Sequence, residues 1–191
     1  MKLIPREGGG YMVMTNLANR GADNVVVAAG AWSLQLLSPL GVHVPLETER
    51  GYHAMLFSPS MRPPIPISSR TRGFFITPME DGVRVAGTVE IGGLDAPPNE
   101  QRAKVLVERA RRLFPDLQAS EVRYWMGFRP STPDSLPILG PVAARPGLYM
   151  AFGHGHFGMS GGPPSGRLLA RMMTGQATGI DPAPYSALRF S

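Results

Sequence analysis

The segment with the clearest chemical potential reads GHGHFGMSGG and occupies residues 153–162. Its glycines leave the backbone bare between an apolar run and a helix expected over residues 164–174. Bare N–H groups beside a helix amino end can contact an anion or a planar cofactor. The pattern therefore favours a binding loop, and a plain strand-to-helix turn is the equal alternative.

Two other chemistries are conceivable for the same loop. Its glycine spacing is not the G-x-G-x-x-G of a dinucleotide fingerprint followed by an acidic residue about 20 positions later. His154 and His156 have a spacing that could share a metal ion, but the chain has no cysteine and no carboxylate lies near them in the sequence. Two imidazoles alone hold zinc poorly. Neither a first Rossmann turn nor a metal site is predicted.

Arg129 lies in GFRPSTPD, residues 127–134, directly before a proline. A guanidinium on a rigid loop is a natural two-pronged partner for a carboxylate. The alternative is a structural arginine paired with Asp134 or Glu121. Both interpretations stay open from the residues alone.

Tyr52 lies within ERGYH, residues 49–53, in a predicted strand. Its phenol could close a substrate pocket, or the ring could pack on one face of a sheet. Packing is the default for a tyrosine in such a strand.

The elements that would position these residues show two different hydrophobic patterns along the chain. Residues 10–15 and 23–29 are predicted as adjacent strands separated by a turn at residues 19–22. The run VVVAA at residues 25–29 does not alternate, which is typical of a central parallel strand buried on both faces. A short helix is expected over residues 33–40.

The middle of the chain is different. Strands are predicted over residues 44–57, 73–78, 83–90 and 121–128. A helix is expected from residue 99 to 114, because Asn99 can cap it and Pro115 ends it. Its apolar stripe comprises Ala103, Leu106, Ala110 and Leu113. This is an antiparallel sheet with one helix, followed by a strand at residues 148–152.

The predicted fold class is α+β or α/β, with two interleaved domains. Residues 1–41 form part of one domain, which residues 129–191 complete. Residues 42–128 form the antiparallel domain and carry the helix over residues 99–114.

Four segments, in this order, resemble one known family: ADNVVVAAGAWS at residues 22–33, RGYH at 50–53, GFRPSTPDSLPILGP at 127–141 and GHGHFG at 153–158. They are similar to the D-amino-acid oxidase superfamily of FAD-dependent oxidoreductases, most closely to the carboxy-terminal portion of bacterial D-amino-acid dehydrogenases. The similarity covers nearly the whole chain.

The resemblance implies an enzyme that oxidises D-amino acids or related amines to imines, which water hydrolyses to keto acids. It makes residues 1–41 and 129–191 the remnant of an FAD-binding Rossmann-like domain and residues 42–128 a substrate-binding domain. The family's amino-terminal G-x-G-x-x-G unit has no counterpart in the chain. FAD is therefore expected in the complete enzyme and absent from this chain alone.

The resemblance also assigns roles to residues. Substrate-binding residues are expected to be Arg129, Tyr52 and His156. Contacts with the cofactor are expected from Ala28, Ala29, Gly30, Trp32, His154, Gly155, His156, Phe157, Gly158 and Met159. No side-chain base is required for the hydride transfer. The rival hypothesis is a non-catalytic remnant, or a subunit that needs a partner chain to supply the nucleotide-binding half.

Composition limits the partners. The formal charge is +5, from 19 basic and 14 acidic residues, with no basic stripe interleaved with aromatics, so nucleic acid is not an expected partner. No run of 18 apolar residues suggests a transmembrane segment. The expected partners are a small amine or D-amino acid and an electron acceptor that the sequence does not identify. Self-association is expected through residues 25–29, and the expected location is cytoplasmic, either free or peripheral to the inner membrane.

Overall fold

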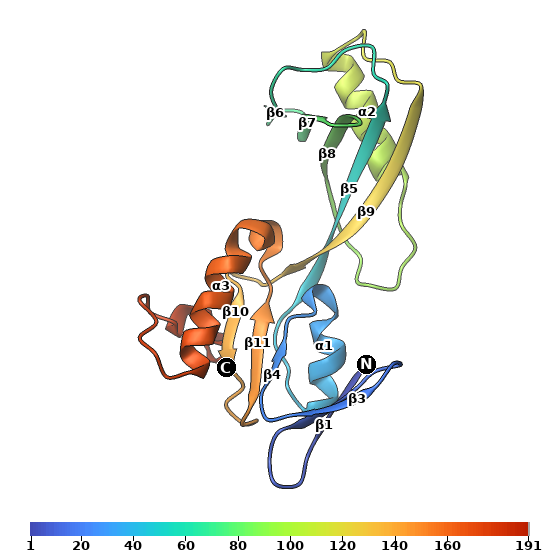
Figure 1. Cartoon of the computed structure of the whole chain (residues 1–191). Helices are drawn as coiled ribbons and strands as arrows, with labels where there is room; N and C mark the ends of the chain where they lie inside the picture. Colours follow the sequence, from blue (N-terminus) through green and yellow to red (C-terminus); the bar gives the residue numbers. More distant parts are fainter. Residues whose placement is uncertain (191) are drawn as a thin grey trace. The chain divides into compact units, whose positions relative to one another are not determined.

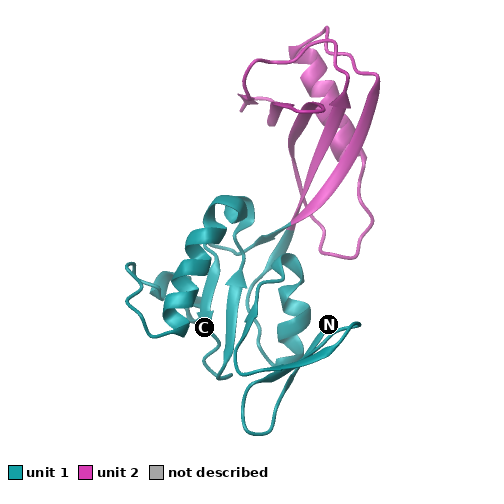
Figure 2. Ribbon diagram, in the orientation of Figure 1, with its two compact units in different colours: residues 1–48, 129–191 teal, residues 49–128 magenta. Residues whose placement is uncertain are grey.

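The computed structural model describes residues 1–190 and divides into two compact units. Unit 1 comprises Met1–Thr48 and Arg129–Ser191, and unit 2 comprises Glu49–Phe128 (Figures 1 and 2). The chain leaves unit 1 along strand β5 (Glu47–Phe57) and returns along β9 (Glu121–Ser131). The sequence placed the first boundary between residues 41 and 42. In the structure Val42, Val44 and Leu46 pack against the core of unit 1.

The main sheet of unit 1 has the strand order β10-β11-β4 (Ile138–Pro141, Leu148–Phe152 and Val25–Val27). β10 and β11 are antiparallel, whereas β11 and β4 are parallel. Helix α3 (Gly158–Met173) packs on β10 and β11, and α1 (Ser33–Leu37) packs against β4. The core between these elements is built mainly from Val27, Leu37, Ile138, Leu148, Met150 and Phe152.

β4 differs from the expectation that it is a central strand with two buried faces. It lies at the edge of the sheet and pairs only with β11 among residues 1–190. Val27 is buried, but the Val26 side chain is 38% exposed. The prediction that both faces are buried is therefore wrong for this chain, because Val26, which points to the face opposite Val27, is not covered.

A separate antiparallel sheet in unit 1 comprises β1 (Lys2–Pro5), β2 (Tyr11–Met14) and β3 (Asn19–Ala22). The turn predicted at residues 19–22 is wrong, since these residues form β3, and β2 pairs with β1 and β3 rather than with β4. The actual turn after β2 is closed by Thr15. Its hydroxyl donates to the Ala18 carbonyl at 2.8 Å and accepts from the Leu17 N–H at 3.1 Å.

Unit 2 is a five-stranded sheet in the order β6-β7-β8-β5-β9, with β6, β7 and β8 at Ile67–Ser69, Phe74–Met79 and Gly82–Ile91. Helix α2 (Gln101–Leu113) packs on β7 and β8. Its buried residues are Ala103, Leu106, Val107 and Ala110, so Val107 takes the place predicted for Leu113, which is 39% exposed. Asn99 accepts a hydrogen bond from the Gln101 N–H at 3.2 Å and so caps the first turn.

Helix α3 begins at Gly158, six residues before the expected start, and contains Pro163 and Pro164. The prediction treated this Gly- and Pro-rich stretch as non-helical. Proline has a φ angle compatible with a helix, but inside one it removes the N–H donor and its ring crowds the carbonyl four residues earlier. The carbonyls that lose this donor belong to Met159 and Ser160, which are exposed, so water can replace it.

Short 3₁₀ helices complete the fold: η1 (Gly30–Trp32), η2 (Ser38–Leu40), η3 (Gly155–Phe157), η4 (Ala183–Tyr185) and η5 (Ala187–Phe190). No helix in the described part of the chain is both long and apolar enough to cross a membrane.

Candidate functional site

Two glycine turns lie at the same edge of the unit 1 sheet. The parallel pairing of β4 and β11 aligns Val25 with Leu148 and Val27 with Met150, so both strands end at one edge. Gly30 follows β4 with φ +56°, and Gly155 follows β11 with φ +51°. These left-handed conformations favour glycine. The carboxyl edge of parallel strands is where open α/β sheets bind ligands.

The end of β9 lies next to both turns. Ser131 forms an isolated antiparallel bridge with His154. A Cβ atom placed on Gly30 would lie 4.0 Å from Cγ of Pro130, and one on Gly155 would lie 3.5 Å from Oγ of Ser131. The structure thus brings three predicted segments together within unit 1: residues 28–30, 129–131 and 153–158.

Arg129 has a buried polar atom without a partner within residues 1–190. Its Nη1 is buried and has no hydrogen-bond partner among the described residues. The acids that could have paired with it are engaged elsewhere: Asp134 with Arg189 at 2.7 Å, and Glu121 with Arg123 at 2.6 Å. The alternative that Arg129 pairs with one of these two acids is therefore wrong. A buried donor without a hydrogen bond costs stability, so a ligand that accepts from it would be favoured.

The amino end of α3 is open to a ligand. It has no side-chain cap, so its first N–H groups have no partner within the helix or in a capping side chain. Phe157 is 69% exposed and Met159 is 97% exposed beside it. This arrangement can hold negative charge and a flat apolar surface at the same place.

The two histidines of the loop have different surroundings. Nε2 of His154 lies 2.9 Å from Oγ of Ser165 on α3, and burial lowers the pKa of the imidazole. The His154 ring thus interacts with helix α3, and its backbone forms the bridge to Ser131. His156 is exposed at the other end of the loop, and Trp32 after β4 is 46% exposed.

Tyr52 belongs to unit 2 and is nearly fully buried. Its hydroxyl donates to a carboxylate oxygen of Glu90 and accepts from the Asn99 N–H at 3.1 Å. The hydrogen bond from Tyr52 is the largest of the causes that lower the pKa of Glu90, and the guanidinium groups of Arg102 and Arg50 act in the same direction. Tyr52 also lines a cavity of about 230 Å³ with Tyr124, Trp125 and Met126, among others.

Arg50 was not predicted as a functional residue. It is fully buried, donates from Nε to the Gly93 carbonyl at 2.7 Å, and lies 3.8 Å from Glu90. Its Nη2 atom is buried without a hydrogen-bond partner in the described part of the chain. The available signal was an arginine directly before Gly51 in a strand that is otherwise apolar on one face.

A comparison with family models decides the identity. The model described as "DAO: FAD dependent oxidoreductase" matches residues 2–172. The chain belongs to this family. Its fold class is also confirmed, because a solved glycine oxidase of Geobacillus kaustophilus superposes on 97% of the chain with a TM-score of 0.81 and 26% identity, and the chain covers 50% of that protein.

Curated relatives of this DAO-family chain include a D-amino-acid oxidase of Bradyrhizobium diazoefficiens, 42% identical over 93% of the chain and 43% of the relative. A glycine oxidase of Pseudomonas aeruginosa is 35% identical over 91% of the chain and 48% of the relative. The chain therefore spans about half the length of these relatives.

Three features of this DAO-family chain are compatible with a flat anionic cofactor and a carboxylate ligand. They are the left-handed glycines Gly30 and Gly155, the uncapped amino end of α3 and the unpartnered Nη1 of Arg129. Within residues 1–190, no group of three or more histidine, aspartate or glutamate side chains could hold a metal ion.

Proposed function

We propose that the chain supplies the substrate-binding and ring-facing half of an FAD-dependent oxidoreductase that converts D-amino acids or related amines to keto acids. The observation that carries the proposal is the buried Nη1 of Arg129, which lacks a hydrogen-bond acceptor and belongs to the residue directly before Pro130 and Ser131, the two residues near Gly30 and Gly155. A substrate carboxylate would give this donor its missing acceptor.

In this proposal Ala28, Ala29 and Gly30 form one side of the ring site, and residues 155–159 form the other. FAD, when bound, would supply the acceptor for the hydride of the substrate α-carbon, and water would hydrolyse the oxidised product, an imine, to the keto acid and the free amine or ammonia. The N–H groups at the start of α3 would hold the negatively charged part of the cofactor. Trp32 and Phe157 supply apolar surface there.

Arg129 holds the carboxylate and so orients the α-carbon. His156 is the second polar residue of this site and would flank the carboxylate. Tyr52 stays a candidate substrate-binding residue, although its hydroxyl bonds to Glu90 and Asn99 support a structural role as well.

A second candidate function is a subunit that works only after a partner chain supplies the nucleotide-binding half. The open edge of β4 favours it, because an unpaired parallel strand can accept a further strand. This arrangement uses the same ring site and the same Arg129, so it changes the assembly and not the chemistry.

The test is a chimera in which the amino-terminal half of the Bradyrhizobium D-amino-acid oxidase is fused to this chain. We expect it to retain FAD and to reduce an artificial electron acceptor with D-amino acids, glycine or sarcosine. The unfused chain should retain little or no FAD through gel filtration, because the helix that binds the pyrophosphate lies in the added half. A chimera that retains FAD but oxidises none of these amines would contradict the proposed activity.

A further inference from the structure

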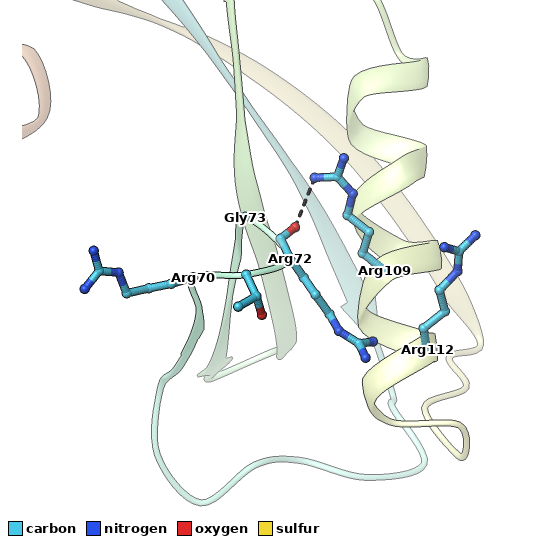
Figure 3. Close-up of a pocket in the computed structure, with 6 residues that line it drawn as sticks. Arg70, Arg72, Gly73, Arg109 and Arg112 are labelled. Carbon is cyan, nitrogen blue, oxygen red and sulfur yellow. Dashed lines mark hydrogen bonds between the residues drawn. The ribbon is translucent and has the colours of Figure 1, made fainter.

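A cavity of about 560 Å³ in unit 2 is lined by four arginines and no acid. Arg70 and Arg72 lie on the turn between β6 and β7, and Arg109 and Arg112 lie near the end of α2 (Figure 3). The other lining residues are Thr71 and Gly73. None of these residues belongs to the site described above.

One of the four arginines, Arg109, connects the helix to the turn through a hydrogen bond. Nη1 of Arg109 donates to the backbone carbonyl of Arg72 at 3.1 Å. In Figure 3 the side chains of Arg72, Arg109 and Arg112 lie on the helix side of the turn, whereas Arg70 extends to the opposite side. Three guanidinium groups from two elements therefore border one side of the cavity.

The positive charge of this cluster is not balanced by the protein. Among residues 1–190, none of the four arginines forms an ion pair, although Arg102, Arg123 and Arg189 each pair with an acid. Arg70, Arg72 and Arg112 are exposed and have no hydrogen bond from their side chains to the described residues. The cluster thus has free donors for a ligand.

The fold explains only part of the cluster. Arg109 fastens the turn, and Arg112 in the last turn of α2 interacts favourably with the negative end of the helix dipole. The turn itself needs the left-handed φ of +64° at Gly73, but it needs no arginine before it. Placing Arg72 beside two other cations adds repulsion that a neutral residue would avoid.

We propose that this cavity binds a phosphate-bearing anion. A phosphate group offers several oxygen atoms and up to two charges, so it can bridge guanidinium groups from the turn and the helix at once. A single carboxylate would neutralise one of them and leave the others unpaired. The phosphate belongs either to a soluble phosphate ester or to the headgroup of a phospholipid, and the experiment distinguishes these sources.

The experiment is calorimetric titration of pyrophosphate into the 191-residue chain at low ionic strength. We expect one site, which weakens as sodium chloride is added. Arg72→Ala/Arg112→Ala should weaken binding by roughly tenfold or more, since two charge-assisted contacts are lost. The matched control is Arg20→Ala/Arg167→Ala, which removes the same charge from exposed positions in unit 1 and should change the affinity by less than about twofold.

A second arm measures co-sedimentation of the same proteins with vesicles of phosphatidylglycerol or phosphatidylcholine. Pyrophosphate binding that the cavity variant loses supports a soluble ligand. Binding to phosphatidylglycerol vesicles alone, lost in the same variant, supports a lipid headgroup. Absence of binding in both arms, equal affinity of the cavity and control variants, or acetate binding as tightly as pyrophosphate would overturn the proposal. If the double variant does not fold, Arg72→Gln on the exposed turn replaces it, judged by the same outcomes.

Discussion

Arg129 is the residue on which the proposed chemistry depends most directly. Its Nη1 is buried without an acceptor, and the acids close to it in the sequence are paired with other arginines. Buried donors without a partner are uncommon, and a ligand that accepts from this one is the explanation that the proposed function supplies. The same argument makes the two substitutions at this position informative.

In a complete enzyme that contains this chain, Arg129→Met should lower kcat/KM for carboxylate-bearing amines. Loss of a buried charge pair costs on the order of 2–5 kcal/mol, which predicts a fall of roughly 30- to several-thousand-fold. Arg129→Lys keeps the charge but loses the two-pronged geometry, so its loss should be intermediate. FAD absorbance should be unchanged in both variants. Activity within about threefold of the parent for Arg129→Met would return the arginine to a structural role.

Asp134 allows a prediction about pH. The hydrogen bonds and charge of Arg189, together with the Leu136 N–H, lower the pKa of Asp134 to about 2. Because the folded pKa lies below the unfolded one, the pair stabilises the protein fully above about pH 4 and loses this contribution as pH falls toward 2. The pair is partly exposed, so its contribution is about 1 kcal/mol or less.

Thermal unfolding of Asp134→Asn checks this contribution. The variant keeps an oxygen acceptor for the Leu136 N–H but loses the charge that faces Arg189. We expect its Tm to be lower by roughly 2–4 °C at pH 7 and the difference to shrink at pH 3. A difference that grows on acidification would show that the pair has the opposite linkage.

Helix α3 directly follows the glycine-rich loop of residues 153–158. Two glycines in and after this helix differ in backbone conformation. Gly166 lies inside the helix, where a Cβ atom would meet no heavy atom within 4 Å, and its φ is not positive. Gly175 follows the helix with equally open space but with φ +67°. The same chemical change at these two positions therefore tests backbone conformation alone.

Gly166→Ala should stabilise the chain by about 0.4–1 kcal/mol, because alanine restricts the unfolded chain and favours the helix. Gly175→Ala should destabilise it by about 1–2 kcal/mol, because an L-residue is strained in the left-handed region. Chemical denaturation of both variants gives the two values. Equal signs would mean that α3 does not end at this position in solution.

The proposed function explains the open edge at strand β4. β4 is the last strand of its sheet, and Val26 on it is exposed. Open edges and exposed apolar groups favour pairing with another chain. In the complete enzyme this edge is where further strands of the FAD-binding domain would pair.

The isolated chain should therefore self-associate, and its mass in light scattering should rise with concentration. Val26→Lys places a charge on the edge strand and should reduce the association. Leu17→Lys is the matched control, since Leu17 is 90% exposed in the turn between β2 and β3. A monodisperse monomer at high concentration, or equal effects of the two variants, would contradict a role for this edge.

The sequence by itself was sufficient to predict the family, the strand at residues 148–152 and most of α2. These features depend on local order: apolar periodicity, a capping Asn99 and glycines directly after a buried run. The four segments that resemble the family also grouped Arg129 with the loop over residues 153–158, and the structure brings these two segments together.

Tertiary structure decided the rest, because it depends on contacts between residues far apart in the chain. Only the parallel pairing of Val25 with Leu148 shows that Gly30 and Gly155 share one edge. Burial turned Arg50 into a core residue, although local sequence does not distinguish it from an exposed arginine. The turn before β7 and the last turn of α2 meet only in the folded unit, so the arginine-lined cavity has no signature in the sequence. Long-range pairing is set by the sum of packing over the whole core, which no local pattern records.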